Sequence, residues 1–178
     1  MEDAMTTITK FKLFWAWQDE KEELWLHEMA KQGLHFRSVG APGLYKFEVG
    51  QPRNDYYRMD FITDRKDYQN YLQLFKDAGW EHLGEMGGWQ YFRTQAEGSA
   101  IPEIYTDKDS KAQKYQRLIV ILIVFLPIFM TITTRPIDPA SPFVDLYFAG
   151  KMIGAFLMIL YVAAMIKIFQ RIQQLKSK

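Results

Sequence analysis

Cysteine is absent from the 178-residue chain, which excludes disulfides, thiolate zinc sites and a cysteine nucleophile. Only three histidines occur, His27, His35 and His82, and their spacing is not that of metal ligands, so ordinary surface or packed histidines are favoured. The 22 basic residues are balanced by 21 acidic ones, which argues against a dedicated nucleic-acid binder. The first ten residues lack the apolar stretch of a cleavable signal peptide.

Familiar catalytic motifs are also missing. The chain has no Walker-type phosphate loop, no G-x-G-x-x-G, no H-E-x-x-H and no G-x-S-x-G. A carboxylate pair such as Glu81 and Glu85 is of a kind that any exposed hairpin offers. We therefore expect no enzyme activity, no catalytic residues, no cofactor and no metal site.

Two long apolar runs lie in the C-terminal part of the chain. Leu118–Thr134 is free of charge and spans roughly 26 Å as a helix, near the lower limit for crossing a bilayer. Pro127 lies within it, and a proline is tolerated in a membrane helix, where it can introduce a kink. A second run covers about residues 145–168 and is interrupted by Lys151, whose long side chain can snorkel to the headgroups, while Met152–Ile166 is free of charge. The sequence predicts a transmembrane hairpin and the lipid bilayer as a partner.

Basic residues flank the hairpin on the side of both chain ends. They precede the first run and follow the second, whereas the intervening loop holds Arg135 alone; the flanking residues are Lys108, Lys111, Lys114, Arg117, Lys167, Arg171, Lys176 and Lys178. The positive-inside bias then predicts cytoplasmic N- and C-termini. Gly150 and Gly154 form a small-residue motif that suits either packing against the first helix or a homo-oligomer.

The N-terminal part shows alternating and helical patterns. Lys10–Trp17 alternates and predicts a strand, and Asp19 with Glu22 resembles a capping box at the start of a helix that runs to about Gln32. Leu34–Val39 and Leu44–Val49 then predict a hairpin.

This pattern repeats 46 residues later. Tyr57, Met59 and Phe61 alternate as Phe11, Leu13 and Trp15 do, and Gly79-Trp80 matches Gly33-Leu34 at the same offset. Agreement of several independent features in one register indicates a duplicated β-α-β-β unit. We expect an α+β fold, ferredoxin-like or GyrI-like, with one antiparallel sheet and both helices on one face. The expected domains are 1–95 (cytosolic domain), 96–117 (polar connector and juxtamembrane helix) and 118–178 (hairpin with a basic tail).

Aromatic residues supply the candidate ligand or partner surface. They either line a pocket for an apolar or cationic molecule or simply fill a small core. Arg58 and Asp60 share one face of a predicted strand and form either a polar-ligand site or ion pairs with neighbours such as Lys12. The candidate surface comprises Trp15, Trp17, Trp25, Arg58, Asp60, Trp80 and Trp89.

Several motifs between Lys10 and Arg117 resemble a bacterial family of unknown function. They are Phe11-Lys12-Leu13-Phe14, Trp25-Leu26-His27-Glu28-Met29-Ala30-Lys31-Gln32-Gly33, Tyr45-Lys46-Phe47, Tyr57-Arg58-Met59-Asp60-Phe61 and Ala78-Gly79-Trp80. They are similar to domain of unknown function 2812, found mainly in Firmicutes, whose members are often encoded beside PadR-type regulators. The resemblance implies a bacterial cell membrane and a PadR-type partner, and it implies no reaction.

Three functions remain open on this basis. The first is a non-catalytic, membrane-anchored sensory or regulatory protein that binds a small amphipathic molecule or a protein partner. The second is an accessory subunit of a membrane assembly such as an efflux system, and the third is an unrecognised membrane-bound enzyme. An aromatic cavity holding one or two polar groups favours sensing, a flat apolar patch favours assembly, and converging ionisable groups with shifted pKa values favour an enzyme.

Overall fold

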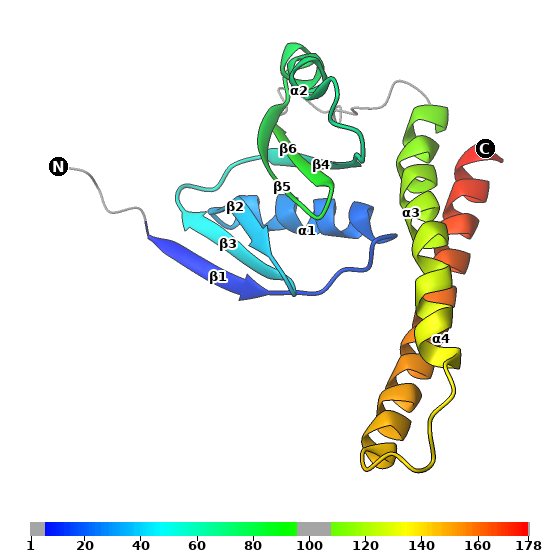
Figure 1. Cartoon of the computed structure of the whole chain (residues 1–178). Helices are drawn as coiled ribbons and strands as arrows, with labels where there is room; N and C mark the ends of the chain where they lie inside the picture. Colours follow the sequence, from blue (N-terminus) through cyan, green and yellow to red (C-terminus); the bar gives the residue numbers. More distant parts are fainter. Residues whose placement is uncertain (1–5, 96–107, 178) are drawn as a thin grey trace. The chain divides into compact units, whose positions relative to one another are not determined.

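The computed structural model describes residues 6–95 and 108–177, so residues 96–107 of the expected connector lie outside the described residues. The chain divides into two compact units, Met1–Ser110 and Lys111–Lys178. The first contains six strands and two helices, and the second contains most of α3 (Lys108–Thr134) and all of α4 (Val144–Lys176) (Figure 1).

The elements of the first unit follow the duplicated order. They are β1 (Thr7–Phe11), α1 (Asp19–Lys31), β2 (Leu34–Gly40), β3 (Leu44–Val49), β4 (Asp55–Phe61), α2 (Tyr68–Asp77), β5 (Glu81–Met86) and β6 (Trp89–Gln95). The α+β class is confirmed, as are two apolar C-terminal helices long enough for a transmembrane hairpin. Both repeats also show the same antiparallel strand order, β1-β3-β2 and β4-β6-β5.

The strands form two three-stranded sheets in place of the single expected sheet. The edge strands β2 and β5 lie against each other but share no ladder. Each contains a register shift, between Phe36 and Ser38 in β2 and between His82 and Gly84 in β5. Because a bulge bends and twists its strand, these equivalent irregularities account for the break between the sheets.

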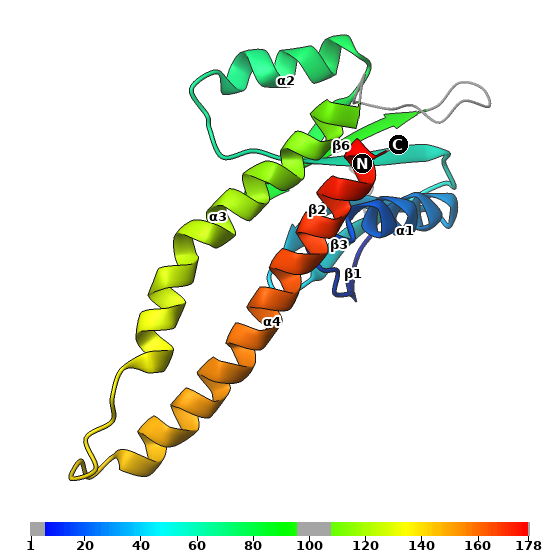
Figure 2. The ribbon, with the colours of Figure 1, turned by 90° about the vertical axis from the view of Figure 1, so that its right-hand side faces the viewer.

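The two helices lie on opposite faces of the second sheet, which differs from the expected arrangement. Tyr91 points towards α1, where its hydroxyl reaches Glu22, whereas its neighbour Phe92 stacks on Phe75 of α2 at 4.1 Å. Successive side chains of a strand point to opposite faces, so α1 and α2 cover different sides of β6. Figure 2 shows α2 and α1 on either side of β4 and β6.

The start of α1 differs from the sequence expectation in two ways. β1 ends at Phe11, and Gln18 closes a later turn by accepting the Trp15 N–H at 3.1 Å and donating its own N–H to the Trp15 carbonyl. The expected capping box is wrong, since the N-cap residue is Gln18 and Asp19 already belongs to the helix. Glu22 instead points inward, which places a carboxylate beside the core.

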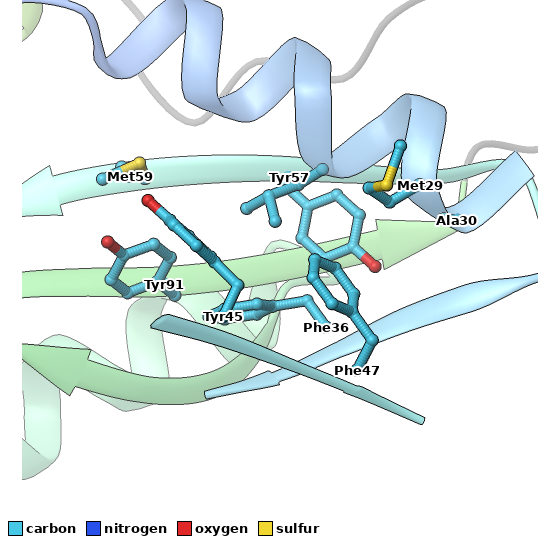
Figure 3. Close-up of a cluster of buried hydrophobic side chains, with 9 residues drawn as sticks. Met29, Ala30, Phe36, Tyr45, Phe47, Tyr57, Met59 and Tyr91 are labelled. Atoms are coloured by element: carbon cyan, nitrogen blue, oxygen red, sulfur yellow. The ribbon is translucent and has the colours of Figure 1, made fainter. Parts of the chain in front are cut away.

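The core of the first unit lies between α1 and the inner faces of both sheets (Figure 3). Leu26 and Ala30 from α1 are fully buried, and Phe47 from β3 is as well. Burial of a side chain as large as that of Leu26 or Phe47 contributes about 1.5–3 kcal/mol. The buried cluster consists of Leu26, Met29, Ala30, Phe36, Tyr45, Phe47, Tyr57, Met59 and Tyr91.

Side chains of α1 and β4 also satisfy the open edge of β4. Glu23 accepts the Met59 N–H at 2.8 Å, the His27 Nδ1 lies 2.8 Å from the Asp55 carbonyl, and Arg58 donates to the Tyr57 carbonyl at 3.0 Å. An unpaired strand edge is a template for aggregation, and these side-chain contacts cover the edge of β4. Two of them come from α1, so they also fix this helix against the second repeat.

The second unit consists of two apolar helices with mostly exposed side chains. Only 6% of the most apolar window of each helix is buried, as expected for surfaces that face lipid and not a protein core. The Tyr161 hydroxyl donates to the Leu122 carbonyl of α3, and the Tyr161 ring lies 5.1 Å from the Phe129 ring. At Gly154 an added Cβ would lie 3.1 Å from Thr133 of α3, so this glycine allows close helix packing.

Candidate functional site

A cavity of about 290 Å³ lies in the first unit beside the start of α1. Its walls come from both repeats: the segment after β1, the first turn of α1, the β2–β3 turn, and the strands β3, β4, β5 and β6. They are mainly aromatic and apolar and comprise Lys12, Leu13, Phe14, Trp15, Ala16, Asp19, Glu22, Ala41, Pro42, Gly43, Tyr45, Met59, Met86, Trp89 and Tyr91.

Glu22 is the best-defined polar group of this cavity. Its side chain is almost fully buried, and one carboxylate oxygen accepts hydrogen bonds from the Tyr45 hydroxyl at 2.7 Å and the Tyr91 hydroxyl at 2.9 Å. Figure 3 shows the two tyrosine rings next to each other, with their hydroxyl oxygens on the same side of the cluster. The helix thus brings an acidic group to a wall that two sheets supply with phenol donors.

Burial shifts the proton affinities of all three groups upward. It raises the pKa of Glu22, while the tyrosine hydrogen bonds oppose this shift and the charge of nearby Asp19 adds to it. The pKa values of Tyr45 and Tyr91 are raised by burial and by the Glu22 charge. Both phenols therefore stay protonated near neutral pH and remain hydrogen-bond donors.

Lys12 shows that the aromatic wall accommodates a cation. Its ammonium group lies 4.8 Å from the Trp25 ring centre and 5.3 Å from the Phe14 ring centre. A cation within about 6 Å of a ring face is attracted by the ring quadrupole. Lys12 is exposed and lines the cavity together with Phe14, whereas the Trp25 ring lies behind the wall.

Two of the predicted tryptophans, Trp15 and Trp89, line the cavity. Trp15 is 55% exposed and lies where the cavity meets solvent. Its ring stacks on that of Trp17, with 5.4 Å between the ring centres. Trp25 stands behind the cavity, edge-on to Tyr45 at 4.8 Å. The structure therefore brings Trp15, Trp17, Trp25 and Trp89 into one region.

The other three predicted residues lie elsewhere in the first unit. Arg58 pairs with Glu23 of α1 at 3.3 Å, and Asp60 accepts a hydrogen bond from the Tyr71 hydroxyl of α2 at 3.1 Å. Trp80 is buried beside a more open hollow near α2. These residues contribute to packing and ion pairing in the second repeat and do not line the aromatic cavity.

Sequence reasoning missed the role of Glu22 because its spacing from Asp19 suggested a capping box. Tyr45 and Tyr91 lie on the last strands of the two repeats but at different register positions, since Tyr45 pairs with Val39 and Tyr91 pairs with Gly84. Neither spacing nor periodicity therefore indicated that both tyrosines meet one carboxylate. The partner on α1 could be found only from the tertiary structure.

The histidines belong to separate polar contacts. The His82 Nε2 lies 2.9 Å from Gln90, and the His35 Nε2 lies 2.9 Å from the Gln51 carbonyl. Burial and the Arg53 charge lower the pKa of His35. Among residues 6–95 and 108–177, no group of three histidine, aspartate or glutamate side chains is arranged to hold a metal ion.

The cavity has two chemical capabilities. An acidic group within aromatic walls binds an organic cation, because the carboxylate supplies charge and the rings supply cation–π contact. A buried carboxyl with a raised pKa also has the property of a general acid, and Asp19 provides a second carboxyl in the same cavity.

The fold and cavity together define an α+β domain joined to two apolar helices of membrane-spanning length. The chain belongs to the family described as "Protein of unknown function (DUF2812)", which matches residues 18–126. The match contains Glu22, Tyr45 and Tyr91 and begins after Trp15 and Trp17. No curated protein and no solved structure matches the chain.

Proposed function

We propose that this protein is a non-catalytic, membrane-anchored regulatory module whose cavity binds a small amphipathic cation. The observation that carries the proposal is the Glu22 carboxylate, buried in an aromatic cavity and held by two tyrosine hydroxyls. A buried carboxylate is costly unless it is paired, so a cationic ligand would satisfy a charge that the fold already positions.

Cavity size and composition limit the ligand. A volume of about 290 Å³ suits a compact molecule with one aromatic or branched apolar group. The positive charge of the ligand would displace the ammonium of Lys12 from the Phe14 and Trp25 rings. The favoured class is therefore a monovalent amine or quaternary ammonium compound with an apolar body.

Ligand binding can be measured on the full-length protein in detergent by tryptophan fluorescence. All five tryptophans lie in the first unit, so the signal reports that unit alone. We expect benzyltrimethylammonium to give saturable quenching and neopentylbenzene, its neutral carbon isostere, to bind at least about tenfold more weakly, because a desolvated cation–π contact contributes about 2 kcal/mol.

Matched variants locate the binding site. Glu22→Gln should weaken benzyltrimethylammonium binding about tenfold or more. Glu28→Gln removes the same charge from the exposed side of α1 and should leave binding unchanged. Lys12→Met should tighten binding, because no lysine then competes for the rings. Equal affinity for the cation and its isostere, or equal loss in both glutamate variants, would reject the cationic ligand.

Anchoring and orientation belong to the same proposal. Basic residues beside the two apolar runs support a hairpin with both termini in the bacterial cytoplasm. Because the chain has no cysteine, Ser141→Cys and Ser177→Cys each introduce a unique label. In intact cells a membrane-impermeant maleimide should modify the first variant and not the second. The reverse pattern would invert the topology.

A second candidate function is an interaction subunit, including a partner of a PadR-type regulator. It is supported by an exposed apolar patch beside β1, an edge strand of its sheet. Phe11 is 62% exposed and pairs in register with Leu44, and Leu13 is 64% exposed. Such a patch suits a protein partner.

The two functions respond to different variants. In a binding assay with a purified PadR-type regulator, Phe11→Ser/Leu44→Ser should abolish the complex and Glu22→Gln should preserve it. The cation-binding assay should show the opposite pattern. If the apolar patch variant binds the regulator like the wild type, the interaction surface lies elsewhere.

A further inference from the structure

The loop end of the helical hairpin contains a second cavity, independent of the aromatic one. It has a volume of about 640 Å³ and lies between the end of α3, the loop and the first turns of α4. Apolar side chains such as Ile132 and Leu146 line it together with two basic residues, Arg135 and Lys151. The cavity therefore combines an apolar wall with positive charge.

The two basic residues stand at the same boundary of the apolar region. Arg135 directly follows the charge-free run Leu118–Thr134, and Lys151 directly precedes the charge-free run Met152–Ile166. In a hairpin both positions fall at one edge of the hydrocarbon layer. This is the depth at which lipid phosphates and glycerol groups lie.

Neither cation is neutralised within the part of the chain that the structure describes. No carboxylate there lies within ion-pair distance of Arg135 or Lys151. Asp138 lines the same cavity, but its carboxylate accepts the Ala140 N–H at 2.9 Å and thereby holds the loop turn. A charged side chain at this depth is costly without a counter-charge, so the cavity has a place for an anion.

The two glycines of α4 have different roles at this cavity. At Gly154 an added Cβ would contact Thr133, whereas at Gly150 it would meet no atom within 4 Å. Gly154 therefore brings the helices together, and Gly150 keeps the space beside them open. An acyl chain can lie in that space.

We propose that this cavity binds an anionic glycerophospholipid, with its phosphate between Arg135 and Lys151 and one acyl chain along Gly150. Two cations and one acid give the site a net positive charge, which favours phosphatidylglycerol over zwitterionic phosphatidylcholine. The proposed ligand of the aromatic cavity plays no part in this argument, so either proposal can fail alone.

Lipid retained by the full-length protein after detergent exchange, quantified by mass spectrometry, tests this site. We expect phosphatidylglycerol to be retained, and phosphatidylcholine and diacylglycerol to be lost. Arg135→Gln/Lys151→Gln should lower retention about 25-fold or more, since each of the two basic residues near anionic lipid contributes about fivefold or more. Lys167→Gln/Lys176→Gln, the matched loss of two charges at the far end of α4, should have no effect.

A second variant tests the cavity without changing charge. Gly150→Leu should fill the space for the acyl chain and lower retention of phosphatidylglycerol. Displacement by inorganic phosphate would identify a simple anion site and overturn the lipid assignment. Equal retention by the wild type and the double variant would also overturn it, as would a dimer that dissociates on Gly150→Leu, because a second copy would then occupy the groove.

Discussion

The two repeats of the first unit share a sequence pattern but use their helices differently. In the first repeat α1 lies in the centre of the unit, with Leu26 fully buried. In the second repeat α2 has no fully buried residue, and Leu72, the equivalent of Leu26, remains partly exposed. One helix builds the core, whereas the other covers the outer face of its own sheet.

This difference explains why the unit contains a cavity. If α2 lay on the same face as α1, it would cover the inner side of the second sheet. With α2 on the outer face, inner residues such as Met59, Trp89 and Tyr91 are left to line a space beside α1. The face of the second sheet that α2 does not cover thus supplies part of the site, and equivalent substitutions in the two repeats can test this comparison.

The largest contrast should come from leucines at equivalent positions. Leu26→Ala should lower the free energy of unfolding by about 3 kcal/mol, because it leaves a cavity in a close-packed core. Leu72→Ala should cost less than about 1 kcal/mol, since that side chain is already partly in water. Urea denaturation of the full-length protein in detergent, followed by tryptophan fluorescence, measures both values. Similar losses would show that α2 is as central as α1.

The glycines that close the two helices should give a smaller contrast. Gly33 and Gly79 have φ angles of +79° and +82°, so an alanine at either position costs about 1–2 kcal/mol of backbone strain. At Gly33 a Cβ would also collide with the carbonyl oxygen of Gly50, while at Gly79 it would meet open space. Gly33→Ala should therefore be the more destabilising variant in the same urea assay. The reverse order would contradict the packing described for the first repeat.

The smallest effect concerns the pH dependence of stability. Because burial raises the pKa of Glu22 above its ordinary value of 4.5, the folded protein holds this proton more tightly than the unfolded chain. The stabilising contribution of this group is complete below pH 4.5 and is lost as the pH rises through the raised pKa.

Glu22→Gln should remove that decline, so the stability difference between wild type and variant should change across this pH window. The position equivalent to Glu22 in the second repeat is Tyr68 on α2, and Tyr68→Phe should leave the pH profile of this window unchanged. Parallel profiles for Glu22→Gln and the wild type would show that the pKa of Glu22 is not raised in the folded protein.

Local patterns were sufficient to predict most elements. The alternation of Leu44–Val49 gave β3 with the correct bounds, and the long apolar runs gave α3 and α4. They failed at Trp15 and Trp17, whose alternation suggested a strand, because the Gln18 side chain closes a turn there. A hydrogen bond of this kind leaves no trace in periodicity.

The sequence alone determined the duplication, the α+β class and two helices of membrane-spanning length, because periodicity and run length are properties of consecutive residues. The tertiary structure decided which face α2 covers, that Glu22 meets Tyr45 and Tyr91, and that Arg135 and Lys151 line one cavity. These features join residues that are distant along the chain, so they depend on how packed layers settle against one another. Side-chain volume and strand twist control that packing, and neither can be read from a repeat of local patterns.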